Sequence, residues 1–268
     1  MESVTASGHV IEGQGTTEAQ WQAWPHLHTM PEISLAELVP AGFRAVIVAP
    51  HPDDEVLASG GMLAMLARRE VPLLVIGVTD GDASHPTSSC WTPEKLAEFR
   101  HGEAIAGLGQ LGVNPQNYLR LSLPDGRVQN HHVQLVESLG QILRSTDMVL
   151  STWLEDGHPD HEASAIAVAE ACAAVQCLHQ QSPVWMWHWA VPGDSGVPWA
   201  QMRRLALTPD AQRRKHLAVL AHASQLTVQD TGAPPVLSPM AVSRMLRAFE
   251  YFFVPQQSHQ VNGLEGRA

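Results

Sequence analysis

The chain has 268 residues, of which 44% are hydrophobic and 16% charged, a composition typical of a folded globular protein and not of a disordered chain. Its 27 acidic and 16 basic side chains give a net charge of −11, which argues against nucleic acid and anionic membrane surfaces as partners, because phosphate groups are bound by concentrated positive charge. No apolar run approaches the roughly 20 residues of a membrane-spanning helix, so no membrane span is expected.

The cysteine content indicates a reducing compartment. Cys90, Cys172 and Cys177 are odd in number and form no Cys-x-x-Cys pair, so a disulfide framework is not expected in a chain of this size. The first residues lack the basic and apolar segments of a secretory signal. We therefore expect a cytoplasmic protein. A homo-oligomer is an additional expectation that does not depend on these features.

The hydrophobic pattern predicts an irregular N-terminal arm followed by one domain. Residues 1–40, rich in Gly, Thr, Gln and Pro, are predicted to be irregular with at most one helical turn, and residues 41–268 to form the domain. Apolar, β-branched runs predict strands at 43–50, 71–78, 118–123, 147–153, 183–191 and 204–208. Periodic segments between them predict helices at 55–69, 93–108, 133–144, 162–175, 209–223 and 239–252.

This alternation of strands and helices predicts an α/β fold with a Rossmann-like, mostly parallel sheet flanked by helices in a single domain. In such sheets, ligands bind outside the carboxyl ends of the strands. The two polar clusters described next both follow a predicted strand directly.

The first cluster, His51-Pro52-Asp53-Asp54, follows the strand predicted at 43–50. His51 and Asp54 are three residues apart, a spacing that places two side chains on one face of a helical turn. They can therefore supply an imidazole nitrogen and a carboxylate to a divalent metal. Asp53 lies between them and must point elsewhere, to the position expected of a general base beside the metal.

The second cluster, His158-Pro159-Asp160-His161, follows the strand predicted at 147–153. One of its two histidines would complete a three-ligand zinc site with an open position for water, the arrangement of a catalytic zinc. The other histidine would face the substrate and donate a hydrogen bond or a proton. Asp160 could orient one of the imidazoles. The same donor set would also suit Fe2+.

Each cluster alone has a purely structural explanation, either a solvated His-Pro turn or a pair of aspartates that cap a helix. Their occurrence together, at the ends of two strands of one predicted sheet, favours the metal site. A nucleotide-binding domain of the same fold is disfavoured, because the turn after the first strand carries two carboxylates where close approach of phosphate requires glycines.

These residues resemble the PIG-L, or LmbE-like, deacetylase family over about residues 43–226. The specific features are Ala49-Pro50-His51-Pro52-Asp53-Asp54-Glu55, the pair Gly60-Gly61, and His158-Pro159-Asp160-His161. Weaker similarities are Thr79-Asp80-Gly81, the helix with Arg100, Glu103 and Leu108-Gly109, Leu123-Pro124-Asp125-Gly126, and Lys215 with His222-Ala223-Ser224-Gln225.

The resemblance implies a zinc hydrolase that deacetylates an N-acetylglucosaminyl compound. It implies that the Zn2+ ligands are His51, Asp54 and His161. It further implies that Asp53 is the general base and that His158 stabilises the oxyanion or protonates the leaving amine. Less directly, it implies sugar contacts for Arg100 and Asp125.

The predicted activity is therefore removal of an N-acetyl group from a small sugar-containing molecule, with release of acetate. One alternative is an amidase that cleaves a larger acyl or thiol-conjugate amide at the same metal site. Another is a catalytically silent carbohydrate-binding module, although zinc binding alone would not require Asp53 and His158. Trp185, Trp187 and Trp189 alternate along the strand predicted at 183–191, and core packing explains them better than a sugar-stacking platform does.

Overall fold

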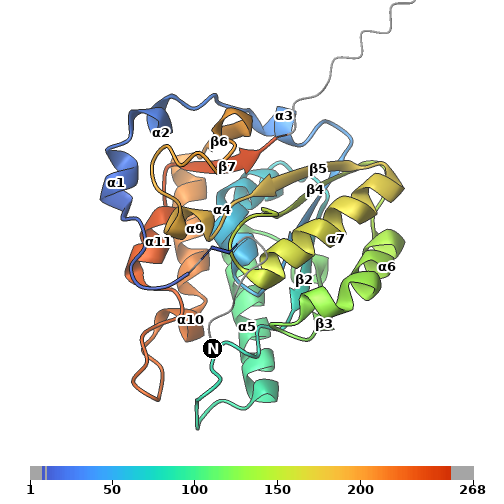
Figure 1. The fold of residues 1–268 in the computed structure, drawn as a ribbon. Helices are drawn as coiled ribbons and strands as arrows, with labels where there is room; N and C mark the ends of the chain where they lie inside the picture. Colours follow the sequence, from blue (N-terminus) through green and yellow to red (C-terminus); the bar gives the residue numbers. More distant parts are fainter. Residues whose placement is uncertain (1–7, 10, 255–268) are drawn as a thin grey trace, which may run out of the picture.

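The computed structural model describes residues 8–9 and 11–254, and in this part of the chain seven strands form one sheet in the order β3-β2-β1-β4-β5-β7-β6 (Figure 1). The strands are β1 (Arg44–Ala49), β2 (Leu73–Thr79), β3 (Tyr118–Leu123), β4 (Asp147–Thr152), β5 (Leu178–Ser182), β6 (Met202–Ala206) and β7 (Phe249–Phe253). The first five are parallel, whereas β7 runs antiparallel to both β5 and β6. The predicted single α/β domain with a mostly parallel sheet is confirmed.

Helices cover both faces of the sheet. The larger ones are α4 (Asp54–Ala67), α5 (Pro93–Leu111), α6 (His132–Ile142), α7 (Pro159–Val175) and α9 (Pro209–Leu220). The shorter ones are α1 (Glu18–Gln22), α2 (Pro25–Thr29), α3 (Leu35–Leu38), α8 (Met186–Trp189), α10 (Ala223–Leu226) and α11 (Pro239–Met245), with 3-10 turns η1 (Pro115–Asn117), η2 (Val128–His131) and η3 (Trp199–Gln201). Because successive strand residues point to opposite faces, Ala45 and Ile47 pack with α4, α5 and α9, whereas Val46 and Val48 pack with α6 and α7.

The strand predicted at 183–191 is wrong. The chain forms β5 earlier, at Leu178–Ser182, and the tryptophan-rich segment forms the short helix α8. The backbone N–H groups of Val184, Trp185 and Met186 all donate to the carboxylate of Asp156, at 2.9 to 3.0 Å. These N–H groups are therefore turned toward one point and cannot form a strand ladder, so this tertiary contact overrides the β-propensity of the segment.

The helix predicted at 239–252 is also wrong in its second half. Helix α11 ends at Met245, and Phe249–Phe253 forms β7 between β5 and β6. The predicted sixth strand, at 204–208, is found two residues earlier as β6.

The N-terminal arm contains three short helices instead of at most one turn. Trp21 of α1 is fully buried, packs edge-on against Trp187 at 5.1 Å between ring centroids, and donates its indole N–H to the Trp187 carbonyl. Arg244 of α11 donates to the carbonyl of Thr16 at 2.7 Å. These contacts fix residues 16–24 on the domain, and a separate boundary at residue 40 stays a prediction.

Two glycines in α4 allow close packing of α9. A Cβ atom on Gly61 would lie 2.5 Å from the Leu207 side chain, and one on Gly60 would lie 3.2 Å from Cγ of Lys215. Helix α4 is interrupted at Ser59, whose backbone is not helical. Shortly after this interruption, the backbone N–H groups of Gly61 and Met62 donate to the carboxylate of Glu250 in β7, at 2.7 and 2.8 Å.

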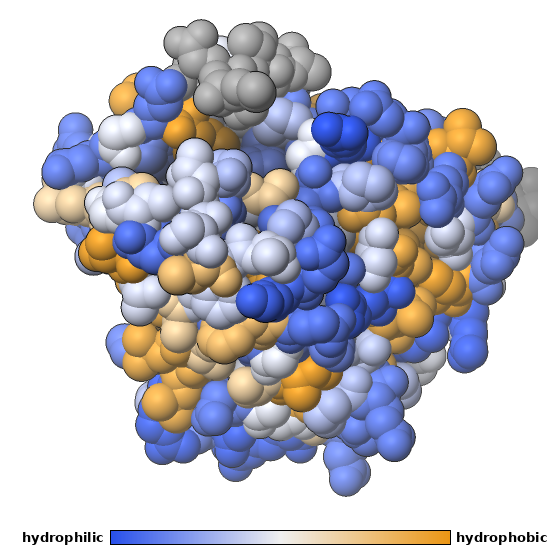
Figure 2. Space-filling view, turned by 90° about the horizontal axis from the view of Figure 1, so that it is seen from below, coloured by the Kyte–Doolittle hydropathy of each residue, from blue (hydrophilic) through white to orange (hydrophobic). Residues whose placement is uncertain are grey.

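The loops after the carboxyl ends of the parallel strands gather at the bottom of Figure 1, where the segments that follow β2 and α10 extend outward. Asp230 joins these two segments by accepting the backbone N–H groups of Ser89 and Cys90. Seen from below, this side of the molecule has hydrophilic residues through its middle and hydrophobic groups beside them (Figure 2). Among the helices of the described residues, none has the length and apolarity needed to cross a membrane.

Candidate metal centre

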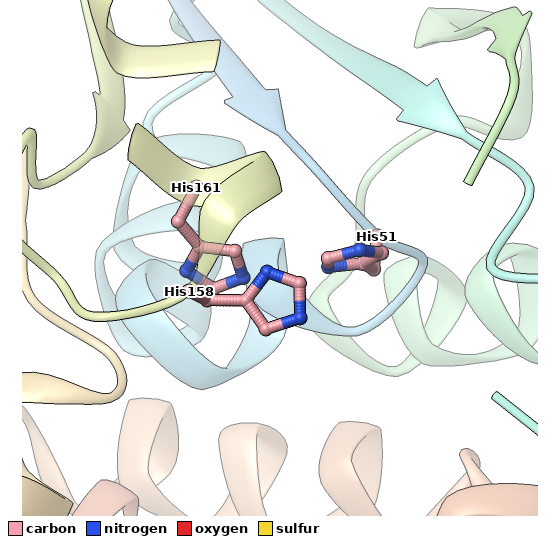
Figure 3. A group of neighbouring side chains, drawn as sticks. All are labelled: His51, His158 and His161. Carbon is pink, nitrogen blue, oxygen red and sulfur yellow. The ribbon is translucent and has the colours of Figure 1, made fainter. Parts of the chain in front are cut away.

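The topology brings the two polar clusters together. Strands β1 and β4 are parallel neighbours, with Ile47 opposite Leu150, so the turns that follow them lie at the same edge of the sheet. The three imidazoles face one another there (Figure 3), with ring centroids 4.8 Å apart for His51 and His158, 5.3 Å for His51 and His161, and 4.8 Å for His158 and His161.

Hydrogen bonding defines which nitrogen of His161 faces the site. Its Nδ1 lies 2.8 Å from Oδ2 of Asp156, whose carboxylate also accepts the three N–H groups at the start of α8. A carboxylate partner requires a hydrogen on Nδ1, so Nε2 is the nitrogen left to face the site and bind a metal. Nε2 is buried, has no hydrogen-bond partner, and lies 3.1 Å from Oδ2 of Asp54.

His51 is oriented in the same way but through its other nitrogen. Its Nε2 lies 3.2 Å from Oδ1 of Asp125 and 3.4 Å from Oδ2 of Asp160. The hydrogen therefore belongs on Nε2, and Nδ1 faces Oδ2 of Asp54 at 3.3 Å. Two imidazole nitrogens and one carboxylate oxygen thus converge from the predicted ligands His51, Asp54 and His161.

The charges around this point also favour a cation. The aspartates Asp53, Asp54, Asp156 and Asp160 are all buried, and the guanidinium of Arg100 is the cation beside them. Although burial lowers it, the charge of Asp54 and the hydrogen bond to Asp156 raise the pKa of His161 to about 9. A metal ion would take the place of that proton. The two imidazoles and the carboxylate therefore fit a divalent metal ion.

Two other groupings place potential ligand atoms within 4.8 Å of one another, namely His51 with His158 and His161, and His51 with Asp125 and Asp160. The hydrogen bonds distinguish His158 from the other two histidines. Its Nδ1 accepts the backbone N–H of Asp160 at 3.2 Å, so its Nε2 carries the hydrogen. Burial, together with the charges of His161 and His51, holds the pKa of His158 well below its ordinary value. His158 is therefore a neutral hydrogen-bond donor.

Asp53 occupies a strained position at the start of α4. Its φ of 148° and ψ of −26° lie in a region that L-residues rarely adopt, and such strain is characteristic of functional sites. Two contacts hold it there, because its N–H donates to Glu55 at 3.0 Å and its Oδ2 lies 3.2 Å from Arg100. Burial raises the pKa of Asp53 to about 7, which suits a general base.

The other predicted residues, Arg100, Asp125 and Asp160, also lie at the site, where each contacts neighbouring residues through hydrogen bonds or ion pairs. Arg100 donates to the carbonyls of Gly81 and Pro52 at 2.9 and 2.8 Å, in addition to its contact with Asp53. Asp125 faces His51 with one oxygen and accepts the N–H of Ala83 with the other. Sugar contacts of Arg100 and Asp125 stay predictions, as does the orienting role of Asp160, which lies near His51 as that role requires.

Several residues of the site had no role predicted from the sequence. Asp156 precedes His158 by two positions, and its acidic, glycine-containing surroundings resemble an ordinary turn. Glu55 is fully buried, and burial with the charge of Asp53 raises its pKa to about 8. The adjoining cavity, of about 240 Å³, is lined by His51, Asp53, Asp54, Leu57, Ala83, Ser84, Arg100, Asp125, Gly126, His158, Trp185, Gln225, Val236 and Leu237.

Fold and site together define a Rossmann-like α/β protein with a candidate histidine–aspartate metal site at the carboxyl edge of its sheet. Residues 46–172 match the model of the PIG-L family, described as GlcNAc-PI de-N-acetylase.

Comparison with known proteins gives relatives over most of the chain. A 1D-myo-inositol 2-acetamido-2-deoxy-alpha-D-glucopyranoside deacetylase of Rhodococcus erythropolis strain PR4 is 23% identical over 84% of this chain and 95% of its own. Among solved structures, the conserved protein TT1542 from Thermus thermophilus has a TM-score of 0.58 and 21% identity, over 84% of this chain and all of its own. N,N'-diacetylchitobiose deacetylase from Pyrococcus horikoshii has a TM-score of 0.50 and 21% identity, over 72% and 77%.

Asp156→Asn is expected to weaken zinc binding by about 10- to 100-fold, because the amide neither carries the charge that supports His161 nor accepts all of its present hydrogen bonds. Competition between the protein and a chromophoric chelator measures the affinity. Asp210→Asn on the surface of α9 is the matched control and should not change it. Equal zinc affinity of the Asp156→Asn variant and the wild type would show that Asp156 does not support the metal ligand.

Proposed function

We propose that this protein is a zinc-dependent hydrolase that removes the N-acetyl group from a small N-acetylglucosaminyl-type conjugate and releases acetate. The observation that carries the proposal is the convergence of three ligand atoms, from His51, Asp54 and His161, beside a buried carboxylate and a neutral imidazole. The match to the PIG-L family model and the deacetylase relatives support the same chemistry.

The residues would act as follows on an acetamide in the cavity. Asp53 accepts a proton from water as the water oxygen bonds to the acetyl carbon. His158 donates its Nε2 hydrogen to the oxygen that becomes negative, a type of contact worth roughly 3 to 4 kcal/mol. The C–N bond then breaks as the nitrogen takes up the proton held by Asp53, and the products are the free amine and acetic acid, which ionises to acetate.

When bound by His51, Asp54 and His161, a zinc ion would make water more acidic and polarise the amide carbonyl. Arg100 keeps Asp53 in place, and its positive charge favours the ionised form of that carboxylate. Asp156 and Asp160 keep the two ligand imidazoles in the tautomers that binding requires.

The cavity favours a small conjugate as substrate, because its volume of about 240 Å³ lies below the roughly 300 to 1,000 Å³ of pockets for drug-sized ligands. A cytoplasmic location remains part of the proposal, and in the described residues Cys90, Cys172 and Cys177 are free thiols. Homo-oligomerisation stays a prediction.

The test is acetate release by the zinc-loaded protein from a panel of N-acetylglucosaminyl glycosides and from N-butyryl and N-octanoyl counterparts. We expect acetate release that a chelator abolishes and zinc restores. Release only of the longer acids would replace deacetylation by a general amidase activity. Absence of any acid from protein with one bound equivalent of zinc would contradict the proposed hydrolase.

A further inference from the structure

Among the three tryptophans of the segment 183–191, only Trp185 lines the cavity. Trp187 is 2% exposed and packs against Trp21 and Tyr251, and the indole N–H of Trp189 donates to the carbonyl of Asp156 at 2.8 Å. Core packing, as expected, thus accounts for Trp187. It does not account for Trp185, which is partly exposed and lies beside the proposed reaction centre.

We propose that Trp185 is a platform for the pyranose ring and makes the enzyme selective for cyclic amino sugars over acyclic N-acetyl amines. This inference rests on the proposed function and goes beyond it, because it assigns the substrate class to a residue outside the metal and catalytic groups.

The position of Trp185 is fixed relative to the metal centre by a single oxygen atom. Oδ2 of Asp156 accepts the backbone N–H of Trp185 at 3.0 Å and lies 2.8 Å from Nδ1 of His161. The side chain of Trp185 also packs against the buried core that contains Leu57 and Leu237. A rigid aromatic surface at a set distance from the reacting group is what a specificity platform requires.

The other surfaces of the cavity suit the edge of a sugar ring. Polar groups of Ser84, Arg100, Asp125 and Gln225 line it together with the apolar Leu57, Trp185, Val236 and Leu237. A pyranose has hydroxyl groups around its edge and C–H groups on its faces, so it can satisfy both kinds of surface at once. An acyclic N-acetyl amine offers no flat apolar face to an indole.

Gln225 is held in place by its own contacts. Its side-chain amide donates to Ser224 Oγ at 2.8 Å, and Ser224 donates to Glu103 through both its N–H and its hydroxyl. The polar side of the cavity is therefore as fixed as the indole, and both sides can discriminate between ligand shapes without rearrangement.

The experiment compares two substrates, methyl 2-acetamido-2-deoxyglucopyranoside and N-acetylethanolamine, in the zinc-loaded wild type and in Trp185→Ala, Trp185→Phe and Trp24→Ala. For the glycoside, we expect Trp185→Ala to lower kcat/KM by about 10- to 100-fold, mainly through KM, and Trp185→Phe to retain most of it. For N-acetylethanolamine, all variants should match the wild type. Trp24 lies in the arm, away from the cavity, so Trp24→Ala should leave both substrates unaffected.

Equal loss of kcat/KM on both substrates in Trp185→Ala would overturn the platform, since a merely structural role affects every substrate. Binding of methyl 2-amino-2-deoxyglucopyranoside to zinc-loaded protein, measured by calorimetry, tests the platform without turnover. An affinity about tenfold weaker in Trp185→Ala than in the wild type supports the platform, even if no acetate is released. Absence of acetate release would contradict only the proposed deacetylase activity. Unchanged affinity would overturn the platform.

Discussion

Asp53→Asn is expected to lower acetate release by about 100- to 10,000-fold and to leave zinc binding unchanged. The amide is nearly isosteric with the carboxylate but cannot accept the proton of the attacking water. Zinc should stay bound because the proposed ligand atoms belong to His51, Asp54 and His161, and Asp53 contacts Arg100 and Glu55 instead. Steady-state turnover and the zinc content of the same preparation measure both quantities.

The backbone of Asp53 supplies a matched control. At a φ of 148° glycine is unstrained, whereas alanine is as strained as aspartate. The free energy of unfolding of Asp53→Gly should therefore be roughly 1 to 3 kcal/mol larger than that of Asp53→Ala. Both variants should be inactive. Near-normal turnover by Asp53→Asn would remove this residue from the mechanism, and equal stabilities of the other two variants would show that the position is not strained.

Lys215→Met is expected to lower the free energy of unfolding by about 3 to 5 kcal/mol. Nζ of Lys215 lies 2.7 Å from Oε1 of Glu250, and both side chains are almost completely buried. Without the ammonium group, the Glu250 carboxylate still accepts hydrogen bonds from the N–H groups of Gly61 and Met62. It then has no counter-charge in apolar surroundings. Urea denaturation followed by circular dichroism measures the change.

The control for this variant lies two residues away on the same helix. Arg213 pairs with Asp210 at the surface, where its side chain is 67% exposed, so Arg213→Met should cost about 1 kcal/mol or less. The double variant Lys215→Met/Glu250→Gln should recover part of the stability, since it removes the unpaired charge. A loss in Lys215→Met no larger than that in Arg213→Met would refute the importance of the buried pair.

The sequence by itself determined the side of the sheet formed by β3, β2, β1 and β4 and the identity of the clustered residues. Strands β1 to β4 were predictable because apolar, β-branched runs report burial locally. The two His-Pro motifs follow β1 and β4, and their three-residue spacing selects side chains that share one face of a turn. Predicting that the motifs meet required only that parallel strands end at one edge of a sheet.

Only the tertiary structure decided the features that depend on contacts between distant segments. Asp156 accepts N–H groups 28 to 30 residues further along, so a segment with strand propensity forms α8 and places Trp185 at the cavity. Likewise, the tautomers of the two histidines in the second motif depend on Asp156 and on the N–H of Asp160, which bond the two rings differently. Composition and periodicity describe each residue in its own segment, whereas tautomers, backbone strain and cavity walls depend on which segments fold against one another.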